Sequence, residues 1–433
     1  MELLTGELKA YISYKDTGEY YLGEIPSHWK TKKGKWLFVK KERPVNANDE
    51  IITCFRDGEV TLRKNRKTEG FTIALKEHGY QGIRKGDLVI HNMDAFAGAI
   101  GVSDSDGKST PVYSVCAPYN PDEVDTYYYA YFLRNLARRG FIQSLAKGIR
   151  ERSTDFRYYD FGLLFLPLPP KKEQVAITQF LNSKIALIDK AISIKERQIE
   201  LLKERRDALI NKAVTKGLDS NAKMKDSGVE WIGQIPEHWE VKKVKHITSK
   251  IGSGVTPAGG GTTYLDSGIP LLRSQNVLFG KISLENVAYI SEKTHASMSN
   301  SQVKKGDILL NITGGSIGRC HFVDFDRVMN VNQHVCIIRP DKIESSFLSS
   351  VLASQVGQGQ IWYFQQGGGR EGLNFQAIKN FLIPYPPLHE QRGVTEYLNE
   401  VAKKTDTIVS VKQAEIEKLK EYKASLINGA VTG

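Results

Sequence analysis

Residues 171–215 read KKEQVAITQFLNSKIALIDKAISIKERQIELLKERRDALINKAVT. Apolar side chains recur along this stretch at alternating steps of three and four residues, which is the spacing of one face of a long helix. The apolar stripe is narrow, and a narrow stripe of this length is typical of a helix that pairs with another helix. The predicted seam consists of Ile185, Ile188, Ile192, Ile199, Leu202 and Leu209.

The partner helix is predicted to come from the same chain. Residues 166–216 align without a gap with residues 383–433, and 22 of the 51 aligned positions are identical. We expect the two helices to pair with each other as an intramolecular antiparallel coiled coil, because each helix needs only its own domain attached at its start. The seam of the second helix consists of Ala402, Val409, Ile416, Leu419 and Leu426.

A second repeat precedes each helix. Residues 15–37, KDTGEYYLGEIPSHWKTKKGKWL, and residues 225–247, KDSGVEWIGQIPEHWEVKKVKHI, are identical at 11 of 23 positions and share a GxIPxHW motif. The turn Lys-Gly-Asp also occurs twice, at residues 85–87 and 305–307. Since a fixed order of motifs is repeated, the chain is predicted to be a pseudo-two-fold internal repeat of one globular domain and one helix.

Each globular part is predicted to be of the α+β class. Strands are expected near Val112–Ala117 and Val331–Ile338, and helices are expected near Tyr127–Leu136 and Ser345–Ala353. The predicted divisions are a first domain at 1–165, a first long helix at 166–216, a linker at 217–227, a second domain at 228–382 and a second long helix at 383–433. Antiparallel helices would place the two domains at opposite ends of the pair.

Composition favours a polyanionic partner in a reducing compartment. The net charge is +11 and the isoelectric point is near 9.2, which suggests nucleic acid. The four cysteines form no CxxC pair, as expected of buried thiols in the cytoplasm. The longest apolar run, Phe161–Leu168, is too short for a bilayer. We therefore expect a cytoplasmic protein that does not interact with membranes.

The sequence motifs that could indicate phosphate binding, metal binding or catalysis are weak. Residues 101–109, GVSDSDGKS, end like a phosphate-binding loop, but five residues instead of four separate Gly101 from Gly107. Cys320-His321 and His334-x-Cys336 could supply four metal ligands, yet strand alternation would send neighbouring side chains to opposite faces, which favours buried thiols. Because no catalytic set with a convincing spacing is found, we expect no catalytic residues, no metal site and no cofactor bound by this chain.

Basic clusters and Gly-rich loops supply the candidate DNA-binding residues. Cations would contact phosphates, and amide, hydroxyl and imidazole groups beside them would contact bases. The candidates in the first half are Arg56, Arg63, Lys64, Arg66, His91, Asn92, Arg150 and Arg152. The candidates in the second half are Arg273, Ser274, Asn276, Thr313, Asn332, Gln333, His334, Arg370 and Asn374. Taken singly, each of these residues is more often a turn or cap residue than a base contact.

The paired motifs resemble those of a known family. The two GxIPxHW motifs, the two PxPPxxEQ motifs at Pro167–Gln174 and Pro384–Gln391, and the KGD turns are similar to those of the specificity subunit of type I DNA restriction and modification enzymes. The resemblance spans essentially the whole chain. It implies a subunit without catalysis that binds double-stranded DNA, two modification (methyltransferase) subunits and, through them, two restriction (translocase and nuclease) subunits. It also implies that the methyl donor, ATP and magnesium are used by those partners.

The sequence adds one expectation of its own and leaves two alternatives open. Since the two globular parts differ strongly outside the shared motifs, they should read two different short sequences, giving an asymmetric bipartite target whose gap is set by the coiled coil. One alternative is a stand-alone DNA methyltransferase or nuclease with an unrecognised active site. The other is a coiled-coil adaptor whose basic clusters are only solvated faces.

Overall fold

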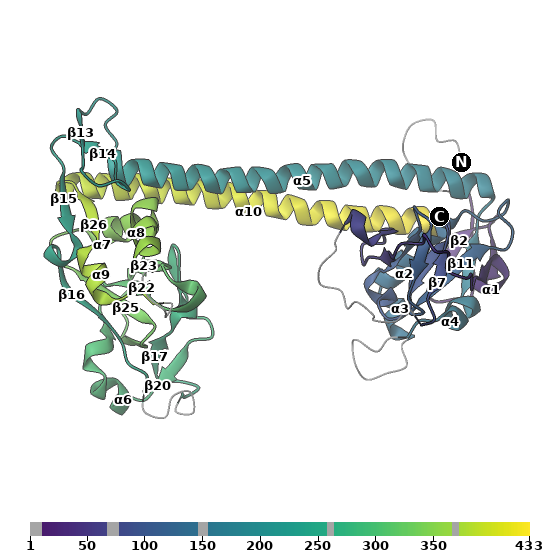
Figure 1. Ribbon diagram of the computed structural model, residues 1–433, viewed down its shortest axis with the longest axis horizontal. Coiled ribbons are helices and arrows are strands. Elements are labelled where there is room, and N and C mark those ends of the chain that lie inside the picture. Colours follow the sequence, from purple (N-terminus) through teal and green to yellow (C-terminus); the bar gives the residue numbers. More distant parts are fainter. Residues whose placement is uncertain (1–10, 67–77, 146–154, 258–263, 366–371) are drawn as a thin grey trace. The chain divides into compact units, whose positions relative to one another are not determined.

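The computed structural model describes residues 11–66, 78–145, 155–257, 264–365 and 372–433 (Figure 1). The chain divides into two compact units, one formed by Met1–Lys195 with Gln413–Gly433 and the other by Glu196–Lys412. The two predicted long helices are present as α5 (Lys171–Lys216) and α10 (Leu388–Thr432). Each long helix contributes one segment to each unit, so the units are described in turn.

The first unit is built on a four-stranded antiparallel sheet. Its strands lie in the order β4 (Phe38–Lys40), β11 (Tyr113–Pro118), β8 (Leu88–His91) and β9 (Ile100–Val102). Helix α2 (Thr126–Arg138) packs on β8 and β9. Leu88 and Ile90 belong to the main core with α2, whereas Val89 belongs to a smaller core on the other side. The central strand is therefore buried on both faces.

Four two-stranded pairs and three short helices complete this unit in the described residues. The pairs are β1 (Tyr14–Asp16) with β2 (Glu24–Pro26), β3 (Lys30–Lys33) with β12 (Phe165–Leu168), β5 (Ile52–Cys54) with β6 (Val60–Leu62), and β7 (Gln81–Ile83) with β10 (Gly107–Ser109). The short helices are α1 (Gly34–Leu37), α3 (Phe141–Ser144) and α4 (Tyr158–Leu163).

The second unit repeats the main sheet. Its strands lie in the order β16 (Thr248–Ser253), β25 (Val335–Pro340), β22 (Ile308–Asn311) and β23 (Cys320–Phe322). The helices are α6 (Glu292–Ser297), α7 (Ser345–Ala353), α8 (Gln355–Gln365) and α9 (Phe375–Asn380). The pairs are β13 (Met224–Asp226) with β14 (Gln234–Pro236), β15 (Glu240–Lys243) with β26 (Leu382–Tyr385), and β18 (Val277–Leu278) with β19 (Lys281–Ile282). The mixture of helices and strands agrees with the predicted α+β class.

A second four-stranded sheet distinguishes this unit from the first. It has the order β20 (Ala288–Ile290), β17 (Ile269–Leu272), β24 (Met329–Val331) and β21 (Gln302–Val303). The single strand expected at Val331–Ile338 is therefore wrong, because it is divided between β24 and β25. Residues 332–334 form a turn in which Asn332 Oδ1 accepts from the His334 N–H at 3.1 Å.

The predicted linker also contains a β-strand, which its polar composition did not indicate. Strand β13 lies within residues 217–227 and pairs with β14 in register, Lys225 opposite Ile235. The same hairpin occurs at β1 and β2, where Lys15 lies opposite Ile25. The hairpin therefore belongs to the repeated unit and begins before residue 228.

Each long helix is attached to its domain by the two repeated motifs, which contact each other. In the first unit Glu173 accepts from Trp29 Nε1 at 3.0 Å, and His28 Nε2 lies 2.9 Å from its other oxygen. In the second unit Glu390 makes the same contacts with Trp239 Nε1 at 2.9 Å and with His238 Nε2 at 2.6 Å. Both tryptophans are fully buried.

The glutamine that follows each glutamate joins the helix to the rest of the domain. Gln174 Oε1 accepts from the N–H of Asp125, the residue that caps α2, at 2.7 Å. Gln391 Oε1 accepts from the N–H of Glu344, at the start of α7, at 2.9 Å. Since both glutamines are completely buried, the direction of each long helix is fixed to its sheet and its covering helix.

Both long helices also touch each other within each unit. In the first unit Lys423 Nζ is 2.7 Å from Asp189, and Lys195 Nζ is 2.7 Å from Glu415. In the second unit Lys412 Nζ donates to Gln198 at 2.6 Å. The partner residue number falls as the α5 number rises, so the paired segments of the first unit are antiparallel. The predicted seam residues are all buried or half-buried, with Ile188, Ile199 and Ile416 buried.

The far end of each helix completes the core of the other domain. Ile427, Ala430 and Val431 of α10 belong to the main core of the first unit, and Val431 O accepts from the Tyr128 hydroxyl at 2.8 Å. Ala213 and Val214 of α5 belong to the main core of the second unit. No helix in the described part of the chain combines the length and apolar character that a membrane span requires.

Replacing Glu173 tests this joint. Burial raises the pKa of the Glu173 carboxyl, and the hydrogen bonds from Trp29, His28 and Tyr11 outweigh it, so the pKa lies below its ordinary value. A lowered folded-state pKa stabilises the fold above the unfolded pKa, and this stabilisation is lost as pH falls through the folded value. We expect Glu173→Gln to lower the free energy of unfolding at pH 7 by about 1–3 kcal/mol and to weaken its fall below about pH 4.3.

Denaturant unfolding at pH 7 and at a series of acidic pH values measures both effects. Glu24→Gln is the control, because Glu24 is exposed in the same unit. Identical pH profiles for wild type and Glu173→Gln would contradict the assignment.

Candidate nucleic-acid interface

The central strand of the first unit ends where three segments of chain meet. The N–H of Asn92, just after β8, donates to Val112 O at 3.0 Å, and the N–H of Phe156, just before α4, donates to Asn92 O at 3.0 Å. We call residues 92–93, 111–112 and 155–157 the first platform. It joins the end of the central strand to the segments that precede β11 and α4.

The second unit repeats this arrangement with the same backbone bonds. The N–H of Ile312, just after β22, donates to His334 O at 3.0 Å, and the N–H of Leu373 donates to Ile312 O at 2.8 Å. We call residues 312–313, 333–334 and 372–374 the second platform. The candidates Asn92, Thr313, Gln333, His334 and Asn374 therefore lie at the same edge of the two sheets.

The first platform borders a hollow of about 730 Å³. Lys40 and Arg157 bring cations to its lining, while Tyr158, Tyr159 and Met93 bring large apolar surfaces. Tyr159 is 69% exposed and Met93 is 46% exposed. Lys40 and Arg157 belong to basic clusters of the sequence, but neither they nor the two tyrosines are among the DNA-binding residues predicted from it.

The second platform is polar. Thr313 Oγ1 lies 2.6 Å from His334 Nδ1, and Gln333 Nε2 lies 2.9 Å from His334 Nε2. Asn374 Oδ1 accepts from the Ala377 N–H at 2.8 Å and so caps α9. Asn332 is buried and orients the turn through the His334 N–H. Side chains that can donate and accept are thus held at fixed positions beside the end of β22.

One arginine stands next to each platform. Arg56 follows β5 and donates to Asp94 Oδ1 at 2.8 Å, two residues beyond Asn92. Arg273 follows β17 and donates to Asn286 O at 3.0 Å. Asn311 Nδ2, at the end of β22, donates to Ser274 O at 2.8 Å, which holds the Arg273–Ser274 turn against the second platform.

Other candidates are engaged elsewhere. Asn276 is buried, and its amide donates to Ser283 O at 3.1 Å and accepts from the Arg273 N–H at 3.1 Å, so we do not retain it as a base contact. His91 is largely covered, burial lowers its pKa, and its Nδ1 accepts from the Asp94 N–H at 3.0 Å. Burial therefore disfavours the charged form of its ring, and we do not retain it as a phosphate contact.

The remaining candidates follow the hairpin of β5 and β6 or fall outside the described residues. Arg63 Nε donates to Thr53 Oγ1 at 3.2 Å, Lys64 pairs with Glu50, and Arg66 pairs with Asp57 and Glu59. Lys64 and Arg66 remain exposed. Arg150, Arg152 and Arg370 lie outside the described residues.

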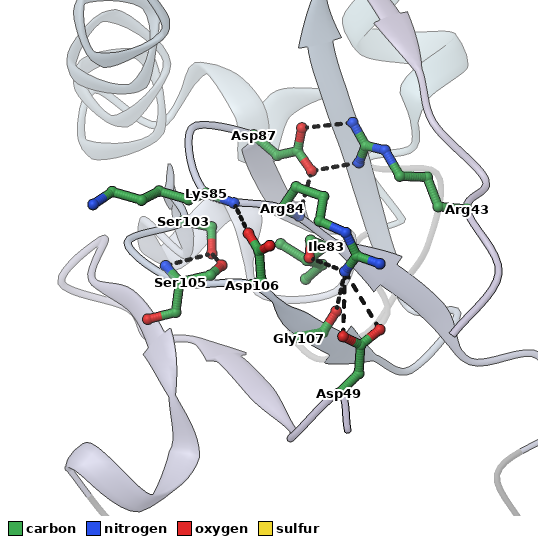
Figure 2. Close-up of polar contacts among 10 residues, drawn as sticks. All are labelled: Arg43, Asp49, Ile83, Arg84, Lys85, Asp87, Ser103, Ser105, Asp106 and Gly107. Carbon is green, nitrogen blue, oxygen red and sulfur yellow. Dashed lines mark hydrogen bonds and ion pairs between the residues drawn. The ribbon is translucent and has the colours of Figure 1, made fainter. Parts of the chain in front are cut away.

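The KGD turns lie at the other end of each central strand, immediately before β8 and β22. Figure 2 shows Asp87 receiving two hydrogen bonds from Arg43, at 2.5 and 3.0 Å, and one from the Arg84 N–H at 2.7 Å. In the second unit Asp307 receives bonds from Arg339 Nε at 2.7 Å and Nη2 at 2.8 Å. Arg43 lies shortly after β4 and Arg339 lies in β25, yet each pairs with a buried carboxylate immediately before the central strand.

The structure also tests the phosphate-binding and metal-binding motifs considered in the sequence. Residues 107–109 form strand β10 paired with β7, and Gly107 O accepts from Arg84 at 3.3 Å (Figure 2). A phosphate-binding loop would lead into a helix instead. All four cysteines are buried and free, and burial raises the pKa of each thiol. Within the described ranges, no group of three or more His, Cys, Asp or Glu residues could hold a metal ion.

The fold and the site together define a class of protein. A basic chain repeats one α+β domain, and each domain presents cations and hydrogen-bonding groups or aromatic surfaces at the same sheet edge. This is a duplicated recognition protein for a polyanion. Residues 236–418 match the family described as the type I restriction modification DNA specificity domain.

Full-length relatives extend this match to both halves. The MjaVIII specificity subunit of a type I restriction enzyme from Methanocaldococcus jannaschii is 29% identical over 316 residues, covering 72% of this chain and 70% of that protein. The putative MjaX specificity subunit from the same organism is 23% identical, with 95% of each chain covered. The chain is therefore similar to type I restriction enzyme specificity subunits over almost its whole length.

A solved structure shows the same fold. A chain from a study of complex assembly and conformational transition of the type I R-M system aligns with a TM-score of 0.70 at 14% sequence identity, covering 94% of this chain and 98% of its own length.

The buried carboxylate of Asp307, immediately before β22, can be tested separately. Asp307 is 1% exposed, and Asp307→Asn leaves Arg339 without its anionic partner. We expect the free energy of unfolding of the second unit to fall by about 3–5 kcal/mol, as for other broken buried ion pairs. Thermal and denaturant unfolding measure the loss, with Asp324→Asn as the control because Asp324 is exposed. A loss no larger than that of the control would contradict a supporting role.

Proposed function

We propose that this chain is the recognition subunit of a type I restriction-modification complex and reads an asymmetric bipartite DNA target. It is not itself an enzyme, and it directs methylation or cleavage by partner subunits. The observation that carries the bipartite target is that two platforms with identical backbone bonds present different side chains. Met93 and Val112 stand in the first platform where Thr313 and His334 stand in the second.

The two long helices act as the spacer between the two readers. Support comes from the pairing of α5 and α10 within each unit and from the buried seam residues Ile188, Ile199 and Ile416. The proposed divisions are domains at 1–165 and 228–382, long helices at 166–216 and 383–433, and a linker at 217–227. In this proposal the helices form one antiparallel coiled coil with a domain at each end, related by an approximate two-fold axis.

The joints between helix and domain make this spacer effective. A spacer fixes the distance between two readers only if neither reader can swing on its attachment. The Glu173 and Glu390 contacts with the buried Trp29 and Trp239 supply that stiffness.

The outer faces of the long helices are proposed to bind two modification subunits. Leu187, Ile194 and Leu201 recur every seven residues on α5 and are 62%, 49% and 46% exposed. Ile408 and Val411 are similarly exposed on α10. An apolar stripe on a helix that already has one partner fits the docking of further helices. Two restriction subunits would join through the modification subunits, and these partner subunits together would use the methyl donor, ATP and magnesium in the cytoplasm.

Lengthening both helices tests the spacer. Inserting four residues near Ile199 and near Ile416 should lengthen the pair by about 6 Å at 1.5 Å per residue, which is nearly two base pairs of duplex. Long-read methylation sequencing of DNA modified by the reconstituted complex gives the gap directly. Substituting four exposed residues at the same places, without insertion, is the control. An unchanged gap in the insertion variant would contradict the proposal that the helices set the spacing.

The purified chain without partner subunits tests whether DNA recognition is separate from methylation and cleavage. Incubated with a methyl donor, magnesium and plasmid, the purified chain should neither methylate nor cleave DNA. It should bind one DNA sequence in preference to random competitor in a gel shift, with affinity that falls steeply as salt rises. Modification or cleavage by the chain alone would favour a stand-alone enzyme. Binding without salt dependence or sequence preference would favour the adaptor.

A further inference from the structure

Four side chains at the second platform form a continuous hydrogen-bond chain. The Thr256 hydroxyl donates to Gln333 Oε1, Gln333 Nε2 lies 2.9 Å from His334 Nε2, and His334 Nδ1 lies 2.6 Å from Thr313 Oγ1. Because an amide nitrogen only donates, His334 Nε2 must accept. The proton of the ring is therefore on Nδ1, which donates to Thr313.

The backbone around Gln333 explains why its side chain is held at the surface. Asn332 and Val335 are buried on either side of the turn, while Gln333 is exposed. Gly254 lets the segment before Thr256 approach this turn, since an added Cβ would lie 1.8 Å from Val331 O. Thr256 therefore reaches Gln333 from one side while His334 holds it from the other, and the amide cannot rotate freely.

The Gln333 amide has more hydrogen-bonding sites than Thr256 and His334 occupy. A primary amide has two acceptor sites on oxygen and two N–H donors. Thr256 occupies one acceptor site and His334 one donor, so one acceptor and one donor remain on an exposed side chain. In the major groove, adenine offers an N6 donor beside the N7 acceptor, whereas guanine offers two acceptors and cytosine a donor. The remaining acceptor and donor of Gln333 match the N6 donor and the N7 acceptor of adenine.

The first platform has no counterpart to this chain at the corresponding positions. The paired backbone bonds align Val112 with His334, which sets Pro111 against Gln333, and the KGD turns align Met93 with Thr313. These three side chains of the first domain offer no side-chain N–H, hydroxyl or carbonyl group. The amide readout is therefore a property of the second domain.

We infer that Gln333 reads an adenine in the half of the target recognised by the second domain, with Thr256, His334 and Thr313 as positioning residues. This inference rests on the proposed function and adds the base and the residue that reads it. The acceptor and the donor of Gln333 meet N6–H and N7 of that adenine in the major groove.

Methylation mapping of the complex reconstituted with its modification subunits tests the assignment. Wild type should give a bipartite motif in which one half contains an invariant A·T pair read by the second domain. Gln333→Ala should reduce the preference for adenine at that single position by roughly 10- to 100-fold, because a good bidentate contact discriminates to that extent. Gln333→Glu has no donor and should shift the preference toward cytosine, whose N4 donates.

Variants of the positioning residues should change the base preference at one position, an effect that a loss of folding would not produce. Thr313→Val removes the acceptor for His334 and should relax the same base pair by a smaller factor, whereas Thr313→Ser should restore it. Met93→Ala, at the corresponding position of the first platform, should leave this half of the motif unchanged. Gln355→Ala is a further control, because Gln355 is exposed elsewhere in the second domain.

The outcomes separate this inference from the proposed function. Relaxation confined to one A·T pair in the Gln333 variants supports the inference. An unchanged motif in Gln333→Ala and Gln333→Glu, or relaxation at a G·C pair, overturns it and leaves the proposed function standing. A wild-type complex that methylates DNA at no discrete motif overturns both.

Discussion

A carboxylate at the start of each long helix holds the buried tryptophan of its domain. Glu173 and Glu390 each receive an indole N–H and lie against a histidine from the same motif. The neighbouring Gln174 and Gln391 join the same helix turn to the start of α2 or α7. The proposed spacer would depend on this joint, because a helix that could swing on its own domain would fix no separation between two readers.

The repeated motifs made much of this architecture accessible from the sequence. The narrow seam from Ile185 to Leu209 identified a long paired helix, and the duplicated GxIPxHW motif identified two equivalent domains. The contact between that motif and the PxPPxxEQ motif was not foreseen, although the recurrence of both at a matched position was the signal.

The site was harder to predict, for reasons that particular residues make clear. Thr313, the Gln333–His334 pair and Asn374 lie on three separate segments, and only the folded sheet edge brings them together. Asn276 looked like a base contact because it follows Arg273 in a polar turn, but burial and backbone bonds occupy its amide. Thr256 was missed because only the glycine two residues earlier permits its approach. The second sheet of the second unit escaped notice because its strands are short and widely separated in sequence.

The contribution of α10 to the first core has a consequence for biosynthesis. Tyr128 bonds to Val431, a partner 303 positions away, and Ile427, Ala430 and Val431 fill the same core. On the ribosome the first domain emerges long before these residues exist, so its apolar surface stays open while the second domain is made. Contacts of such long range slow folding and prolong exposure to aggregation. Until residues 427–431 have been made, the nascent chain therefore carries apolar surface that favours aggregation.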